Sequence, residues 1–265
     1  MYRNTFLSVM FLACCFNGSL CAQSDAQIYE RTCDAKTYPF SDPSPVATPN
    51  NSYYPYFRFD GFSMQAQEKQ WKMVVLENDY VKLTVTPEIG GKIWGAIDKV
   101  NNKEFVYTNG VVKFRDVAMR GPWTSGGIEF NFGIIGHAPT CSTPIDYLTK
   151  KNVDGSVSCH IFSYEWITRT VWNVEINLPK DKAYFTTHTT WFNQSSIDQP
   201  YYQWMNAGYA TKTGTRFYYP GTYSIGHSGD LHPYPIDEEG RDVSWYDNNN
   251  FGASKSLHTV SYTHL

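Results

Sequence analysis

A two-residue alternation of apolar and polar side chains is the sequence feature that most restricts how this chain can fold. In residues 80–86, Val81, Leu83 and Val85 alternate with lysine and threonine residues, as in a strand with one buried face. The sequence shows neither sustained helical periodicity nor an internal repeat. These patterns predict an all-β chain, folded as a predominantly antiparallel β-sandwich. Further strands are expected at residues 72–76, 92–97, 104–107, 165–177, 183–193, 200–211 and 216–219.

The longest expected hairpin joins residues 165–177 to residues 183–193 through a turn at residues 179–182. If the first of these strands alternates throughout, Trp166 and Trp172 share one face and Glu165 lies on the other.

The two ends of the chain are expected to lie outside the folded domain. Residues 1–22 combine Arg3, a short apolar run and a small-residue cleavage site, which predicts a signal peptide and a secreted or periplasmic protein. We expect residues 23–55 to form a proline-rich, extended lead-in and residues 56–259 to form the sandwich. Residues 260–265 resemble a sequencing adapter read in one frame, so we expect the natural chain to continue, with room for downstream domains.

Charge and composition limit the classes of partner. Without residues 1–22 the chain keeps 21 basic and 25 acidic residues, a balance too mild to predict nucleic acid or an anionic membrane as partner. We expect no membrane insertion once the signal peptide is cleaved. The 20 tyrosines, 16 phenylalanines and 8 tryptophans fit an extracellular protein that handles sugars, and they equally fit any β-rich core.

Three cysteines remain after the signal peptide, namely Cys33, Cys141 and Cys159. An oxidising compartment would permit a bridge between Cys141 and Cys159, although an odd count without motif spacing does not require one. The sequence contains no zinc-binding motif and no calcium-loop spacing. We therefore expect neither a metal nor a cofactor.

The glycine-rich stretch of residues 120–139 is the candidate functional segment. It combines the side chains that a sugar site needs, a flat apolar face with directional donors and acceptors, in Arg120, Trp123, Glu129, Asn131 and His137. Its glycines allow a close approach to a ligand or a positive φ. The alternative is a set of tight turns between strands with polar surface residues.

Alternation within this stretch predicts the direction of two side chains. Ile128, Phe130 and Phe132 fill one face, so Glu129 and Asn131 point together to the other, which is either a groove or solvent.

Further along the chain, Trp204 and Asn206 share a face and serve either a pyranose or the core. Hydrolysis of a glycosidic bond needs a second carboxylate beside Glu129. The candidates for it are Glu88, Asp116 and Asp146.

Several motifs, taken in order, resemble a known family. They are Gly-Gly-Lys-Ile-Trp (90–94), Gly-Gly-Ile-Glu-Phe-Asn-Phe-Gly-x-x-Gly-His (126–137), Trp-Phe-Asn-Gln-Ser (191–195), Tyr-Gln-Trp-Met-Asn-Ala (202–207) and residues 244–256. The resemblance is to secreted, galactose mutarotase-like proteins classed as a domain of unknown function and often found with tetratricopeptide repeats. It covers residues 56–257 and implies the supersandwich fold of aldose epimerases, with a carbohydrate ligand on the concave face of the sheet.

The sequence departs from classical mutarotases at their catalytic histidine. Where those enzymes carry an Asn-His-x-Tyr-Phe-Asn motif, this chain has Gln203, Trp204, Met205 and Asn206. Ring opening needs both an acid and a base, so mutarotase activity is not predicted.

We therefore expect an exported protein that acts on or binds a carbohydrate. If it cleaves glycosidic bonds, Glu129 and His137 are the acid–base pair, while the substrate is held by Arg120, Trp123, Asn131, Trp204 and Asn206. The alternatives are a non-catalytic glycan-binding module of a larger protein and a structural sandwich beside a catalytic domain.

Overall fold

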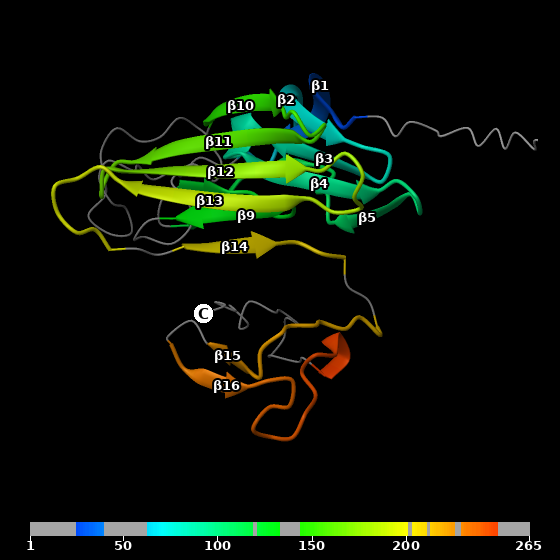
Figure 1. Ribbon diagram of the computed structural model, residues 1–265, viewed down its shortest axis with the longest axis vertical. Helices are drawn as coiled ribbons and strands as arrows, with labels where there is room; N and C mark the ends of the chain where they lie inside the picture. Colours follow the sequence, from blue (N-terminus) through cyan, green and yellow to red (C-terminus); the bar gives the residue numbers. More distant parts are fainter. Residues whose placement is uncertain are drawn as a thin grey trace, which may run out of the picture.

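The computed structural model describes residues 25–39, 63–118, 121–132, 144–200, 203–210, 213–225 and 229–248, with the side chains of residues 115–118 and 121–122 excepted. The described residues form strands, turns and two short 3₁₀ segments. Two sheets lie face to face (Figure 1), and the expected all-β sandwich is confirmed.

The larger sheet has eight strands, and its order is β14-β9-β4-β3-β2-β1-β6, with β5 paired to β4. All its pairings are antiparallel except the short β1–β6 pair. The strands are β1 (Gln27–Tyr38), β2 (Gln67–Glu77), β3 (Val81–Thr86), β4 (Lys92–Asp98), β5 (Lys103–Val106), β6 (Val112–Lys113), β9 (Ile128–Phe132) and β14 (Gln203–Ala207).

The smaller sheet is a four-stranded antiparallel meander, β10-β11-β12-β13. Two short hairpins complete the strand set. The remaining strands are β7 (Arg115–Ala118), β8 (Gly121–Trp123), β10 (Asp146–Lys151), β11 (Val157–Glu165), β12 (Thr170–Leu178), β13 (Thr186–Asn193), β15 (Tyr223–Ile225) and β16 (Leu231–Pro233).

Apolar side chains from both sheets meet in one core between the layers. In the large sheet, alternate residues of β3 and β9 belong to this core, as their sequence pattern predicts. The link between the layers is a stack of Phe132 on Trp172, with ring centroids 4.9 Å apart and planes 8° apart. Trp172 is fully buried, so this pair fastens β9 to β12.

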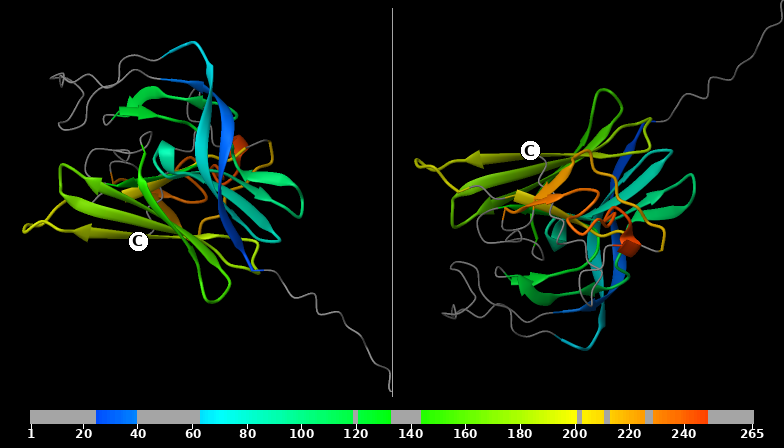
Figure 2. Two further views of the ribbon diagram at one scale, coloured as in Figure 1. Left: turned by 90° about the horizontal axis from the view of Figure 1, so that it is seen from above. Right: turned by 90° about the horizontal axis from the view of Figure 1, so that it is seen from below.

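The opposite face of the large sheet, called here the outer face, carries a second apolar cluster. Its members include Trp71, Trp94 and Phe114. The β7–β8 hairpin lies on this side, away from the smaller sheet (green in Figure 2, left). The outer face of the large sheet is therefore not part of the core between the two sheets, but part of it is still buried.

The expected hairpin of residues 165–177 and 183–193 is present as β12 and β13, but the prediction is wrong for the first residues of its first strand. Residues 166–169 form a turn between β11 and β12 rather than a strand. Trp166 does not share the buried face of Trp172, because its side chain is 63% exposed. Glu165 lies at the end of β11 and is fully buried.

Other strand boundaries also differ from the sequence prediction. The strand expected at residues 200–211 is β14, which spans Gln203–Ala207. Residues 216–219 form no strand, and Arg216 only makes an isolated bridge with Trp245. The sequence does not predict β1, β10 or β11. Strand β1 pairs along its length with β2, so the large sheet includes residues ahead of residue 56.

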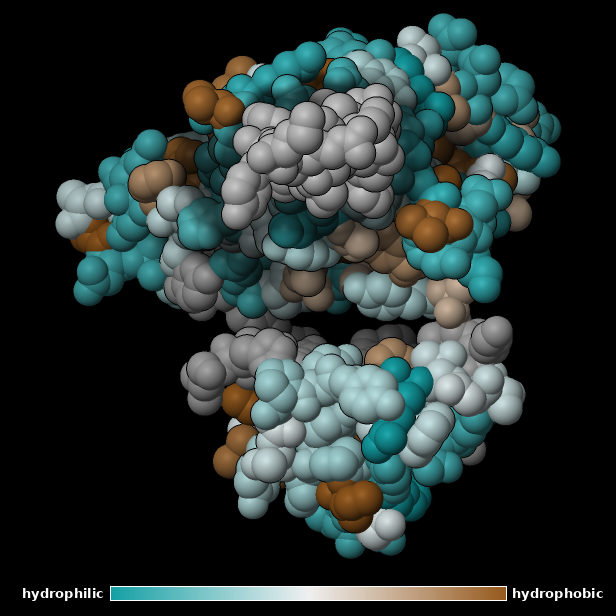
Figure 3. Space-filling model, turned by 45° about the vertical axis from the view of Figure 1, so that its right-hand side comes forward, coloured by the Kyte–Doolittle hydropathy of each residue, from teal (hydrophilic) through white to brown (hydrophobic). Residues whose placement is uncertain are grey.

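The chain after β14 forms a separate segment below the sandwich in Figure 1, with β15, β16 and the short 3₁₀ turn η2 (Tyr246–Asn248). A furrow runs between this segment and the sandwich in the space-filling view (Figure 3). Within the segment, Arg216 lies against the rings of Tyr218 and Trp245 and 3.6 Å from Asp242. In the described part of the chain, no helix is long and apolar enough to cross a membrane.

Cys159 is expected to resist thiol reagents in the folded protein. Burial, assisted by the negative charge of Glu30, raises the pKa of the Cys159 thiol to about 12, and the thiolate is the reactive form. At pH 8 iodoacetamide should label the half-buried Cys33 and should modify Cys159 only after unfolding in urea. Mass spectrometry of the labelled peptides checks this, and equal labelling of both cysteines in the native protein would contradict it.

Candidate functional site

Three strands of the large sheet bring a row of polar side chains together on the outer face. Asn206 on β14 pairs with Glu129 on β9. Ile93 on β4 pairs with Ile128 on β9, which puts Lys92 and Glu129 at adjoining positions of neighbouring strands. Because Ile93 and Ile128 face the sandwich core, Lys92 and Glu129 face outward. The row thus places an ammonium, a carboxylate and a carboxamide side by side.

A second pair lies two residues along the same strands. Trp204 on β14 is opposite Asn131 on β9, and both point to the outer face together with Glu129 and Asn206. Asn131 is 1% exposed and Glu129 is 4% exposed. Trp204 is half-buried and Asn206 is exposed. The site therefore grades from buried polar groups on β9 to accessible ones on β14.

A residue from the β7–β8 hairpin closes over the buried carboxylate. The indole Nε1 of Trp123 donates a hydrogen bond to Oε2 of Glu129. Lys92 is itself buried, and its Nζ donates to the carbonyl oxygen of Thr124 at 2.8 Å and lies 3.2 Å from the Thr124 hydroxyl. The same ammonium lies 5.8 Å from the Trp94 ring centroid and 5.9 Å from that of Trp123.

The buried charges of Lys92 and Glu129 favour one fixed arrangement of the side chains around them. A charge taken out of water is costly unless it is paired and hydrogen-bonded. Lys92 and Glu129 are opposite in charge, adjacent in the sheet and each hydrogen-bonded to the segment of Trp123 and Thr124. We call Lys92, Trp123, Glu129, Asn131, Trp204 and Asn206 the outer-face site. It offers preorganised donors and acceptors between aromatic rings, and the described residues contain no cluster that could ligate a metal.

The glycines just before β9 set the position of Glu129. Gly126 and Gly127 have φ values of 78° and 68°, which favour glycine. The Gly127 amide donates to the Tyr107 carbonyl at 2.9 Å, and its own carbonyl accepts from the Gly208 amide at 2.8 Å. A Cβ on Gly127 would lie 2.2 Å from the Ile93 carbonyl oxygen. The positive φ is thus used to join β9 to β4 and to the end of β14.

The structure brings together five of the seven residues predicted for the site. Trp123, Glu129, Asn131, Trp204 and Asn206 lie on one face, and for Glu129 and Asn131 that face is sheltered rather than open to solvent. Arg120 and His137 lie outside the described residues.

The carboxylates proposed as partners of Glu129 lie elsewhere or are not described. Glu88 accepts the backbone amide of Lys72 at 2.6 Å. Asp146 is exposed at the start of β10, in the other sheet. The side chain of Asp116 is outside the described set. No second carboxylate is therefore recorded beside Glu129 among the described side chains.

Lys92 and Thr124 are site residues that the sequence analysis missed. Lys92 stands inside the apolar run of β4, between Gly91 and Ile93, and a lysine in a strand buried on both faces is rarely tolerated without a partner. The position of Lys92 in a buried strand is therefore the sequence feature that could have identified it as a site residue. Thr124 has no such feature.

Comparison with known proteins gives a family and a fold. A family model described as a domain of unknown function, DUF5107, matches residues 48–265. Among solved structures, the chain resembles a TPR-domain-containing protein from Parabacteroides distasonis ATCC 8503, with a TM-score of 0.72 and 24% sequence identity over 83% of this chain. The match covers 38% of that protein's chain, so the likeness shows a shared fold over part of a longer protein. The chain described here belongs to the DUF5107 family.

Proposed function

We propose that this chain is an exported carbohydrate-binding β-sandwich that holds its ligand at the outer-face site. The observation that carries the proposal is the grading of that site. Half-buried Trp204 and exposed Asn206 lie on an edge strand directly beside the buried polar groups Asn131 and Glu129. A pyranose has an apolar face and a rim of hydroxyls, and such a surface meets both needs.

Each part of the site would have a distinct role in binding. The Trp204 indole would stack on the apolar face of a sugar ring, and the Asn206 carboxamide would both donate to and accept from its hydroxyls. Glu129 is 4% exposed and already holds Trp123, so its carboxylate would fix the Trp123 indole beside the ligand before binding, which reduces the entropy lost. The resemblance to galactose mutarotase-like proteins, which implies a carbohydrate ligand on a face of the sheet, supports a site on a sheet face.

A glycan array probed with the mature chain tests this proposal. We expect binding to a restricted set of glycans, with Kd values in the micromolar to millimolar range typical of small open sites, about 4 to 8 kcal/mol of binding free energy. A folded chain that binds no glycan on an array covering plant, microbial and animal polysaccharides would overturn it. Far-ultraviolet circular dichroism of the same sample establishes that the chain is folded.

A second candidate function, hydrolysis of a glycosidic bond with Glu129 and His137 as the acid–base pair, is favoured by the position of Glu129. The carboxylate is sheltered from water and fixed in position by an indole N–H, and acid–base catalysis requires a positioned carboxyl group. The reaction also needs a carboxylate or another base across the bond, and His137 would have to supply it.

Replacing Glu129 with glutamine separates the two candidate functions. Glutamine keeps an oxygen that can accept the Trp123 hydrogen bond but cannot transfer a proton. If the chain is a hydrolase, turnover of the array-selected glycan should fall by about 10²–10⁴-fold, while Glu104→Gln on exposed β5 leaves it unchanged. Chromatography of the products measures this. Equal turnover in wild type and Glu129→Gln would contradict hydrolysis by Glu129, and absence of turnover in wild type would leave binding alone.

A further inference from the structure

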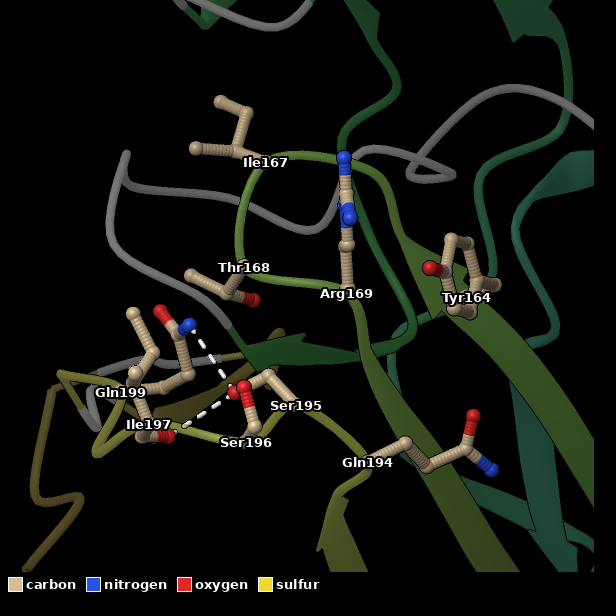
Figure 4. Close-up of a pocket in the computed structure, with 9 residues that line it drawn as sticks. All are labelled: Tyr164, Ile167, Thr168, Arg169, Gln194, Ser195, Ser196, Ile197 and Gln199. Carbon is tan, nitrogen blue, oxygen red and sulfur yellow. Dashed lines mark hydrogen bonds between the residues drawn. The ribbon is translucent and has the colours of Figure 1, made fainter.

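A second hollow, remote in sequence from the glycine-rich stretch, lies at one end of the smaller sheet. Its volume is about 670 Å³, and it lies between the β11–β12 turn and the chain that leaves β13 (Figure 4). Both segments are at the same end of the sandwich, where β13 and β9 finish (Figure 1). We call it the end cleft. It is lined by Tyr164, Ile167, Thr168, Arg169, Gln194, Ser195, Ser196, Ile197 and Gln199.

One wall of the end cleft is a turn built around a buried carboxylate. Glu165 is fully buried, and its oxygens accept the backbone amides of Ile167 at 3.2 Å and Thr168 at 2.7 Å and the Thr168 hydroxyl at 2.6 Å. The Thr168 and Thr170 hydroxyls lie 2.9 Å apart. This bracing holds Arg169 at φ 56°, a conformation that a residue with a Cβ adopts at some cost. The wall is therefore fixed before any ligand arrives.

The opposite wall is braced by side-chain contacts of its own. Asn193 donates to the Ile197 carbonyl at 2.8 Å, and its oxygen accepts the Ser195 amide at 3.0 Å. Gln199 donates to the Ser195 hydroxyl at 3.1 Å. These contacts form a compact loop, so both sides of the end cleft have a defined shape.

The main charged group of the end cleft is the guanidinium of Arg169. Arg169 is exposed, and among the described residues it has no hydrogen bond, ion pair or ring contact. Its side chain extends from the turn on the side of the Tyr164 ring, whereas the Gln194 carboxamide, on the opposite wall, points away from it (Figure 4). The adjacent carboxylate, Glu165, is already occupied by three donors. A guanidinium with a free fork of donors matches a carboxylate or sulfate oxygen pair.

Exposed aromatic side chains lie in or next to the two segments that form the end cleft. Trp166 is 63% exposed and meets Tyr164 edge to face, with ring centroids 5.2 Å apart. Phe192, at the end of β13, is 52% exposed. Exposed ring faces next to a cleft that contains a guanidinium suit a ligand that carries both an apolar ring face and a negative charge.

We propose that the end cleft binds an anionic sugar unit, with Arg169 receiving its carboxylate or sulfate ester and the Tyr164 phenol receiving one of its hydroxyls. The lining of the end cleft includes one guanidinium, and the chain has a net charge of −3, which fits one anionic group rather than a polyphosphate backbone. The inference goes beyond the function proposed above, because the end cleft shares no residue with the outer-face site. Each site can therefore be tested without the other.

Replacing Arg169 with asparagine tests the end cleft. Asparagine tolerates the left-handed backbone, so the variant should fold with unchanged or slightly higher stability while losing the cation. The probes are an oligogalacturonate, a sulfated galactan oligosaccharide and a neutral galactan oligosaccharide, titrated by calorimetry at low and at physiological salt. We expect the affinity for at least one anionic probe to fall tenfold or more, and the remaining affinity to lose its salt dependence. Arg169→Lys, which keeps the charge without the planar fork, should give an intermediate loss.

The pattern across probes identifies the anionic group and separates the two sites. Loss confined to the oligogalacturonate assigns a carboxylate, and loss confined to the sulfated probe assigns a sulfate ester. Trp204→Ala should leave this anion-dependent affinity unchanged, so a failure of the outer-face site would not affect the result. Absence of any affinity for anionic probes in the wild type, or equal affinity in wild type and Arg169→Asn, would overturn the proposal.

Discussion

Gly127→Ala is expected to lower the free energy of unfolding by about 3 kcal/mol and the melting temperature by about 10 °C. The added Cβ would lie 2.2 Å from the carbonyl oxygen of Ile93, a backbone atom of buried strand β4. A backbone oxygen cannot rotate away as a side chain can, so β9 and β4 must separate. Alanine also disfavours the φ of 68° at this position. Urea denaturation followed by circular dichroism measures the change.

Gly214→Ala is the matched control for this substitution. Gly214 has a φ of 84°, and a Cβ there would meet no heavy atom within 4 Å. It should therefore show only the left-handed backbone cost, about 1 kcal/mol. Equal destabilisation by the two substitutions would contradict the view that close contact of Gly127 with β4 holds the outer-face site together.

Trp172→Ala is expected to cost about 4 kcal/mol of unfolding free energy, the range for removing a fully buried tryptophan. Trp172 is fully buried and stacks on Phe132 across the two sheets, so the substitution opens a cavity where the layers join. Trp166→Ala is the control, because that side chain is 63% exposed and its loss should cost about 1 kcal/mol or less.

A conservative variant keeps the Trp172 prediction testable if the alanine variant does not fold. Trp172→Phe retains a ring against Phe132 and should lose about half as much stability as Trp172→Ala in urea denaturation. If Trp172→Ala, Trp172→Phe and Trp166→Ala all lowered the free energy of unfolding by the same small amount, the stack of Phe132 on Trp172 would not be the link between the sheets.

Local sequence patterns predict the strands of the sandwich core well. The alternation of Val81, Leu83 and Val85 reports burial on one side, and the structure confirms it, because the side-chain direction in a strand follows from the backbone alone. The same rule predicts that Glu129 and Asn131 share a face opposite to Phe130. Such features need no knowledge of distant contacts.

Strands at the sheet edges are harder to predict. Strand β1 is largely exposed along its length and includes charged residues such as Glu30 and Asp34. It is held by pairing with β2, a contact between segments far apart in sequence. The β11–β12 turn is also not predicted from the sequence, because the backbone amides of Ile167 and Thr168 are satisfied by the Glu165 side chain instead of by a neighbouring strand. Side-chain hydrogen bonds can compete with a sheet ladder.

In the candidate site, too, some residues are predicted by local sequence patterns and others only by contacts between distant segments. Glu129, Asn131, Trp204 and Asn206 are predicted from residue type and alternation, and the β9–β14 pairing brings them together. Lys92 is added only by the neighbouring strand β4. The outer face is sheltered at Glu129 by Trp123 of the β7–β8 hairpin. The residue pattern of β9 alone does not predict this contact.

A calorimetric titration of an array-selected neutral glycan into wild type, Trp204→Ala and Met205→Ala tests the outer-face site most directly. Met205 is adjacent to Trp204, 53% exposed and on the opposite side of β14, so it controls for a general disturbance of the edge strand. We expect Trp204→Ala to weaken binding about tenfold, the loss of one aromatic stacking contact, and Met205→Ala to change it less than twofold. Unchanged affinity in Trp204→Ala, or equal losses in both variants, would contradict the placement of the glycan on the outer face.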